Sequence, residues 1–304
     1  MSFVEPTSQN PVQIILGDAR QELAKLPDET FQSCITSPPY WGVRDYGIAG
    51  QIGAEPILTD YITDLVKIFR EVRRVLRKDG TFWLNIANTY TSGGRKWRQE
   101  DSKNRGRFMS YRPDTPEGLK KKDLIGVAWM LAMACQLDGW YLRNDIIWYK
   151  PNCQPESVKD RLTVSHEYIF LMTKSETYAF DQNAIMEIRK DGNGLKNKRT
   201  VWSINTDPFP EAHFAVFPPE LVRPCLQAGS KDNDLVLDPF FGAGTVGLTA
   251  LELGRRCVGI EMKPEYVEIA QRRVAKVQMQ LGFKSSEWKT SRKHERGTIA
   301  FANS

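Results

Sequence analysis

Short apolar runs, separated by polar turns and amphipathic stretches, set the pattern of this 304-residue chain. Runs with the length and apolar content of buried strands occur at 12–18, 31–35, 81–86, 234–238 and 257–261. Residues 60–78 have the spacing of an amphipathic helix with a basic end, and 245–254 that of a helix ended by glycine. Strand, turn and helix in succession are typical of an α/β protein, whose open sheets bind ligands at the carboxyl edge.

A rigid polar loop, Thr36-Ser-Pro-Pro-Tyr40, follows the run 31–35. Two successive prolines have a fixed φ and no N–H, so their carbonyls are presented without competing donors. The Ser37 hydroxyl and the Pro38 carbonyl can therefore accept the two N–H groups of an amino nitrogen. The ring of Tyr40 offers a flat face on which a nucleobase can stack. A surface turn is the alternative interpretation, because proline pairs are common in loops.

A glycine-bearing turn, Asp238-Pro-Phe-Phe-Gly-Ala-Gly-Thr245, joins the run 234–238 to the helix 245–254. Gly242 and Gly244 let a ligand approach the backbone and the helix N-terminus closely. Glu261 ends the next apolar run, where a carboxylate can accept the hydroxyls of a ribose. The string 242–247 also satisfies Gly-x-Gly-x-x-Gly, so an NAD-dependent oxidoreductase stays open as an alternative.

Together, the loop and the turn resemble the catalytic and cofactor motifs of amino-group DNA methyltransferases that use S-adenosylmethionine. The resemblance runs from about Val12 to Val274, and the catalytic loop precedes the cofactor turn, as in the permuted beta group. It implies an α/β fold of the Rossmann-like S-adenosylmethionine-dependent methyltransferase type, with a mostly parallel, doubly wound sheet and a circularly permuted motif order. Residues 144–151 and 165–172 resemble the family's strand pair beside the target-base pocket.

The same resemblance assigns roles to single residues. The catalytic set is Ser37, Pro38, Pro39 and Tyr40. Asp18 is expected at the adenine, Asp238 at the methionine ammonium and Glu261 at the ribose. The expected cofactor contacts are Asp18, His213, Phe217, Asp238, Pro239, Phe240, Phe241, Gly242, Gly244, Thr245 and Glu261. Core packing is the alternative for the two phenylalanines of the turn.

Charge is modest overall, at +5, but it is unevenly distributed. Residues 93–123 hold ten Lys or Arg against five acids, with aromatic residues interleaved, which suggests a segment that binds phosphates. A second basic stretch, 189–199, falls where the beta group carries its target-recognition region. The expected DNA contacts are Arg95, Lys96, Arg98, Arg105, Arg107, Lys196, Lys198 and Arg199. A solvated surface loop is the alternative for such charge runs.

The chain is long enough for one catalytic domain over 1–304, with inserted DNA-contacting segments at approximately 91–123 and 183–205. The absence of a long apolar run and of a basic-then-apolar leader predicts a cytoplasmic protein without a membrane span. Five scattered cysteines predict free thiols and no metal site.

The leading functional hypothesis is transfer of a methyl group to the exocyclic nitrogen of a base flipped from double-stranded DNA. A serine-led motif resembles the cytosine-N4 enzymes, and adenine N6 is the alternative, because serine and aspartate both accept a hydrogen bond. Other classes are the NAD-dependent oxidoreductase and an inactive DNA-binding homologue. A cognate restriction endonuclease is a candidate partner, and the chain is expected to be a monomer or a homodimer.

Overall fold

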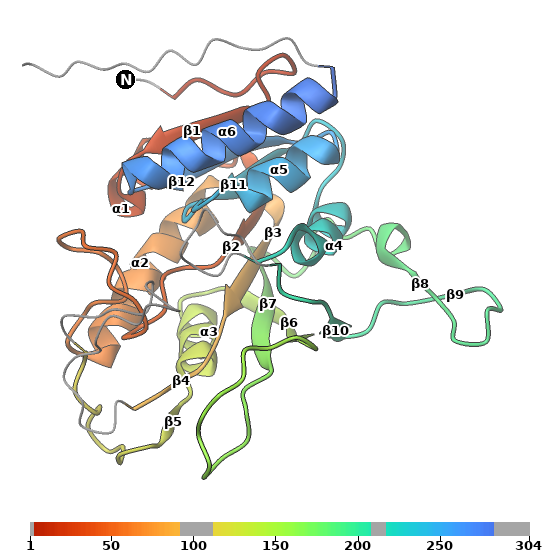
Figure 1. The fold of residues 1–304 in the computed structure, drawn as a ribbon. Coiled ribbons are helices and arrows are strands. Elements are labelled where there is room, and N and C mark those ends of the chain that lie inside the picture. The colour runs from red at the N-terminus through yellow and green to blue at the C-terminus, as the bar shows by residue number, and fades with distance from the viewer. Residues whose placement is uncertain (1–2, 92–111, 208–216, 283–304) are drawn as a thin grey trace, which may run out of the picture.

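The computed structural model describes residues 3–91, 112–207 and 217–282. Within these ranges an eight-stranded sheet has the order β1-β12-β11-β2-β3-β7-β6-β10 (Figure 1). Its strands are β1 (Val12–Leu16), β2 (Phe31–Thr36), β3 (Leu76–Ile86), β6 (Tyr141–Tyr149), β7 (His166–Thr173), β10 (Val201–Ser203), β11 (Leu235–Asp238) and β12 (Arg256–Glu261). Only β7 runs antiparallel to its neighbours, β3 and β6. The prediction of a mostly parallel α/β sheet is confirmed.

Helices cover both faces of the sheet (Figure 1). They are α1 (Ala19–Glu22), α2 (Leu58–Val75), α3 (Val127–Leu137), α4 (Pro219–Gly229), α5 (Thr245–Glu252) and α6 (Pro264–Gln280), with 3-10 turns η1 (Leu23–Lys25) and η3 (Asn183–Ile185). Side chains alternate along β11: Leu235 and Leu237 join the core under α1 to α3, whereas Val236 joins the core under α4 to α6. The sheet is therefore doubly wound, as predicted.

The helix predicted for 60–78 starts and ends earlier than expected. α2 stops at Val75, and Leu76 is already extended, with φ −69° and ψ 144°. Leu76 is fully buried and pairs with Phe31 of β2, so sheet pairing outweighs the helical pattern of 76–78. The predicted boundary at 78 is wrong for this reason.

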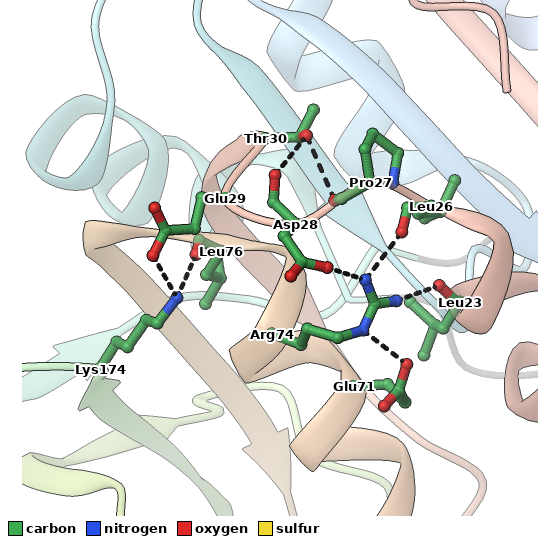
Figure 2. Close-up of polar contacts among 10 residues, drawn as sticks. All are labelled: Leu23, Leu26, Pro27, Asp28, Glu29, Thr30, Glu71, Arg74, Leu76 and Lys174. Carbon is green, nitrogen blue, oxygen red and sulfur yellow. Dashed lines mark hydrogen bonds and ion pairs between the residues drawn. The ribbon is translucent and has the colours of Figure 1, made fainter.

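Arg74, in the last turn of α2, fastens the helix to the connection that leads into β2 (Figure 2). Its Nη2 and Nη1 donate to the carbonyls of Leu23 and Leu26, at 2.8 and 2.9 Å. The guanidinium also pairs with Asp28 and, at 2.9 Å, with Glu71. These bonds fix the chain just before the strand that carries the Ser-Pro-Pro-Tyr loop.

We expect Arg74→Met to lower the free energy of unfolding by about 1–3 kcal/mol, because the Leu26 carbonyl loses its donor, the Leu23 carbonyl keeps only the Leu26 N–H, and Asp28 and Glu71 lose their ion-pair partner. Urea unfolding measures the change. Arg70→Met is the matched control, since Arg70 is largely exposed and pairs only with Asp138 among the described residues. Equal effects of the two substitutions would contradict the role given to Arg74.

The predicted insert 183–205 divides into two parts. Its first part carries a small hairpin of β8 (Glu187–Ile188) and β9 (Leu195–Lys196), which projects from the rest of the protein (Figure 1). Its last part, β10, pairs with β6 and forms the edge of the main sheet. Residues 201–203 therefore belong to the sheet, and only the hairpin projects. The single-domain organisation stays a prediction.

Two further strands, β4 (Thr89–Tyr90) and β5 (Leu124–Ile125), pair beside α3. In the described part of the chain, no helix is both long enough and apolar enough to cross a membrane.

Candidate active site and cofactor pocket

A cavity of about 240 Å³ lies where β1, β2, β11 and β12 end at the carboxyl edge of the sheet. Most of the predicted site residues line it, although they come from opposite ends of the sequence. These are Asp18, Ser37, Pro38, Pro39, Tyr40, Phe217, Pro239, Phe240, Phe241, Gly242, Thr245 and Glu261. Asp238 and Gly244 do not line the cavity, and His213 lies outside the described residues.

The Ser-Pro-Pro-Tyr loop is held by hydrogen bonds to the segment 53–61. The Tyr61 hydroxyl donates to the Pro39 carbonyl at 2.9 Å, and the Trp41 indole donates to the Glu55 carbonyl at 2.8 Å. Trp41 is 4% exposed and packs in the core, away from the cavity. No donor in the described residues bonds to the Pro38 carbonyl. That carbonyl and the Ser37 hydroxyl are therefore available to a ligand in the cavity.

A polar network behind Tyr40 was missed by the sequence analysis. The Tyr40 hydroxyl donates to Glu167 Oε2 at 2.8 Å, and Asn85 Nδ2 donates to the same oxygen at 3.0 Å. Lys150 donates to Glu167 Oε1 and places its ammonium over the Trp148 ring, 4.2 Å from the centroid. All four partners line the cavity. The available signal was the pair of charged residues, Lys150 and Glu167, within the segments assigned to the strand pair.

Charge within this network is balanced. Burial alone would raise the pKa of the Glu167 carboxyl, but the Lys150 ammonium and the donors Tyr40 and Asn85 hold it below its ordinary value. Burial, together with the nearby Glu167 charge, raises the pKa of the Tyr40 phenol well above its usual range. Tyr40 therefore stays a protonated donor and Glu167 an ionised acceptor at neutral pH.

The glycines of the cofactor turn are explained by packing as well as by ligand access. Gly244 has φ +82° and caps α5, and a Cβ there would lie 3.0 Å from the Cβ of Ala270. At Gly247 and Gly259 a Cβ would lie 2.6 and 2.2 Å from the ring of Phe241. The ring of Phe241 therefore fills space left by these glycines. Most of this side chain packs in the core, which was the alternative interpretation for it. Gly247 completes the formal dinucleotide pattern because Phe241 needs the space.

Two carboxyl groups with raised pKa lie at the ends of β11 and β12. Asp238 is 1% exposed and accepts from Thr36 Oγ1 at 2.6 Å and from the Phe240 N–H at 3.0 Å. Burial raises its pKa to about 7, against those two hydrogen bonds. Burial also raises the pKa of Glu261, whose oxygens accept the N–H groups of Gly242 and Lys263, each at 2.8 Å. No cationic side chain forms an ion pair with Asp238 in the described ranges, and of the two carboxyl groups only that of Glu261 lines the cavity.

Asp18 lines the same cavity from the end of β1, the strand that pairs with β12. It caps α1, and both of its oxygens accept from Arg20 Nε at 3.0 Å. Arg20 also donates to the Gly50 carbonyl at 2.7 Å, which ties the loop after the Ser-Pro-Pro-Tyr motif to α1. That loop contributes cavity residues that the sequence analysis missed, namely Arg44, Tyr46, Ile48, Gln51 and Ile52.

The basic residues predicted to touch DNA fall into two groups. Arg95, Lys96, Arg98, Arg105 and Arg107 lie outside the described residues. Lys196 and Lys198 both face Glu187, at 3.8 and 3.1 Å, and Arg199 is exposed. The charge of the two lysines is thus partly offset on the hairpin.

The described cysteines carry free thiols, and all but Cys153 are buried. Among the residues that the structure places, no group of three or more His, Cys, Asp or Glu side chains is arranged to hold a metal ion.

The fold and the cavity define an α/β protein that brings the Ser-Pro-Pro-Tyr loop, the glycine-bearing turn and Glu261 together at one edge of its sheet. A family model described as DNA methylase (N6_N4_Mtase) matches residues 31–272, so the chain belongs to this family of DNA methyltransferases. Membership confirms the predicted class and decides against the NAD-dependent oxidoreductase.

Individual relatives agree with the family match. The chain is 60% identical over 263 residues to the type II methyltransferase M.SmaI of Serratia marcescens, covering 86% of this chain and 90% of that protein. The solved PvuII DNA methyltransferase (cytosine-N4-specific) has a similar fold, with a TM-score of 0.65, 20% identity and coverage of 87% of this chain and 86% of that one. A putative DNA modification methylase from Thermus thermophilus, solved with S-adenosyl-L-methionine, gives a TM-score of 0.61 at 25% identity, covering 87% of this chain and 93% of that one.

Proposed function

We propose that this DNA methyltransferase transfers a methyl group from S-adenosylmethionine to N4 of a cytosine flipped out of double-stranded DNA. The methyl donor is that of the family, and the Thermus thermophilus neighbour was solved with it. The choice of cytosine is carried by one observation. The acceptor at the cavity is the serine of a Ser-Pro-Pro-Tyr loop, which resembles the loop of cytosine-N4 enzymes.

The loop geometry supports amino-group chemistry. An exocyclic nitrogen is a poor nucleophile because its lone pair is delocalised into the ring. Ser37 and the carbonyl of Pro38 would each accept one N–H, which draws the nitrogen toward tetrahedral geometry and aims its lone pair at the methyl group. Tyr40 would support the base from its ring face, and the stiff proline pair keeps both acceptors in place.

The cavity supports the cofactor assignments. The ammonium is assigned to Asp238, which directly precedes the cavity-lining Pro239 and Phe240 and whose buried carboxyl would be stabilised in its ionised form by a cationic ligand. Glu261 and Asp18 line the cavity at positions suited to the ribose and the adenine. Phe217 lines it from the segment before α4, which is proposed, with His213, to close over the methionine tail.

Product analysis tests the base assignment. Purified protein is incubated with S-adenosylmethionine carrying a labelled methyl group and with mixed-sequence duplex DNA, which is then digested to nucleosides and separated by chromatography against methylated standards. We expect label in N4-methyldeoxycytidine. Label in N6-methyldeoxyadenosine would establish the adenine alternative, and absence of label in every base would favour an inactive DNA-binding homologue.

We further propose that the basic segments hold the duplex by its phosphates. Replacing Arg95, Lys96, Arg98, Arg105 and Arg107 with alanine should weaken binding to all duplex sequences and flatten the salt dependence of affinity, because fewer counterions are released. Fluorescence anisotropy over a salt series measures both quantities. A Lys25→Ala/Lys67→Ala variant, which removes two exposed lysines, is the control. Unchanged affinity with an altered methylated sequence would show base reading in place of phosphate binding.

The setting of the enzyme is proposed from the same evidence. A cytoplasmic DNA methyltransferase protects a site from cleavage when a restriction endonuclease of the same specificity is present, and the relative M.SmaI is a type II methyltransferase. We propose such an endonuclease as the partner, and a monomer or homodimer as the active form.

A further inference from the structure

The Glu167 carboxylate is placed to set the direction of a chain of hydroxyl groups that ends at the catalytic serine. It accepts hydrogen bonds from three described groups on three different elements: Tyr40 in the loop, Asn85 in β3 and Lys150 after β6. All three partners are donors in these contacts, which requires an acceptor-only carboxylate at this position. Its side chain is 16% exposed and so is that of Lys150, so the pair is shielded from bulk water.

The direction of each hydrogen bond follows from the Glu167 carboxylate, which can only accept. The Tyr40 hydroxyl has one hydrogen, and its contact to Glu167 Oε2, at 2.8 Å, is much shorter than its contact to Asn85 Oδ1, at 3.5 Å. With that hydrogen committed to Glu167, Tyr40 Oη can only accept from Ser37. The Ser37 hydroxyl lies 3.4 Å away and donates to it. The lone pairs of Ser37 Oγ are then left for a donor in the cavity.

We propose that Glu167 is a positioning residue that acts through Tyr40: it orients the two hydroxyl groups so that Ser37 presents lone pairs, and not its hydrogen, to the amino group of the target base. Without this bias, the Ser37 hydrogen is free to point at the amino nitrogen and to bind the lone pair that must attack the methyl group. The role rests on the proposed function, because it needs an N–H donor at Ser37.

Lys150 supports the same hydrogen-bond chain. Its ammonium balances the charge of Glu167 in the shielded site, which keeps the carboxyl ionised when Tyr40 and Asn85 bind it. Its contact with the Trp148 ring fixes the ammonium from the other side. The indole of Trp148 is itself anchored to the Ile204 carbonyl at 2.8 Å. The residue after β6 therefore supplies the counter-charge, and β7 carries the carboxylate.

The test is a double-mutant cycle on single-turnover methyl transfer. Glu167→Gln keeps the size of the side chain, but its amide can donate to Tyr40 Oη, which reverses the chain and turns the Ser37 hydrogen toward the base. We expect transfer to slow on the order of tenfold to a hundredfold, the scale for one misdirected polar contact, with affinities for S-adenosylmethionine and DNA unchanged. Tyr40→Phe removes the hydroxyl that links Glu167 to Ser37 and should slow methyl transfer by a comparable factor.

The double variant separates the mechanisms. In the Tyr40→Phe background, Glu167→Gln should have almost no further effect, because the carboxylate acts only through that hydroxyl. Multiplicative effects would mean that Glu167 acts on the reaction directly, by charge or by shaping the pocket, and would overturn the proposal. A wild-type transfer rate in Tyr40→Phe would also overturn it, even if Glu167→Gln failed to fold.

Controls separate this inference from the proposed function. Glu71→Gln, a partly buried carboxyl of α2 paired with Arg74, should leave transfer unchanged. If the wild-type protein methylates no amino group, the proposed function fails. If it methylates one and Glu167→Gln matches its rate, only the role of Glu167 fails. Methylation of adenine in place of cytosine would leave the role intact, since both bases offer an amino group.

Discussion

Ser37→Ala should slow methyl transfer on the order of a hundredfold or more while leaving the affinity for S-adenosylmethionine close to that of the wild type. Ser37 lines the cavity from the loop that follows β2, and its hydroxyl is the side-chain acceptor proposed for the amino group. Loss of one preorganised polar contact in a shielded site has this magnitude. The Pro38 carbonyl would remain, so activity should fall and not vanish.

Single-turnover transfer to duplex DNA, measured beside calorimetric titration with S-adenosylmethionine, gives the two quantities separately. Ser175→Ala is the matched control, because Ser175 bonds to the Lys78 carbonyl at 2.7 Å far along the sequence from the loop. It should leave both quantities unchanged. Near-normal transfer by Ser37→Ala would mean that Ser37 only shapes the turn.

The strands were predictable because their apolar runs are local. The run 234–238 corresponds to β11 at Leu235–Asp238, and 31–35 to β2 at Phe31–Thr36. The errors in predicted element boundaries lie where pairing between distant segments determines the secondary structure. Leu76 leaves the helix because it pairs with Phe31, and 201–203 become strand β10 because β6 offers an edge. Neither partner is visible within a local window of sequence.

The site shows the same division. Ser37 and Glu261 could be predicted to line a ligand site because each belongs to a continuous motif whose residue types indicate a function. Both line the cavity. Glu167, Lys150 and Asn85 were missed because they are single polar residues in three separate strands or strand ends, and only the sheet brings them to Tyr40. The structure also shows a role for the Tyr40 hydroxyl, whereas the sequence had indicated one only for the ring. The Tyr40 hydroxyl is bonded to Glu167, so Tyr40→Phe removes more than a solvent contact.

Packing further limits which substitution tests the cofactor turn. Gly244 is left-handed and its Cβ position meets Ala270, so a larger residue there would strain the fold whatever its effect on ligands. Asp238 is the better probe, because Asn has nearly the same shape and keeps an oxygen for Thr36 Oγ1 and the Phe240 N–H.

Asp238→Asn should weaken S-adenosylmethionine binding about 10- to 100-fold and, at the same time, stabilise the ligand-free protein at alkaline pH. The affinity loss is that of a charge-assisted contact to the ammonium. The stability gain follows from burial, which raises the pKa of Asp238 in the folded chain from the ordinary 3.8 to about 7. Because folding raises the pKa of Asp238, this carboxyl contributes fully to the stability of the folded protein below pH 3.8. That contribution is lost as pH rises through 7.

Urea unfolding at pH 5 and pH 8, without ligand, measures this effect. The free energy of unfolding of the variant should exceed that of the wild type by on the order of 2–4 kcal/mol at pH 8, because asparagine has no charge to bury. The difference should be smaller at pH 5. In the wild type, S-adenosylmethionine affinity should fall as pH drops below 7, since the ammonium binds the ionised carboxyl. Asp232→Asn, an exposed carboxyl paired with Arg255, is the control and should change neither quantity. A variant that binds S-adenosylmethionine as tightly as the wild type, with the same pH dependence, would remove Asp238 from the cofactor site.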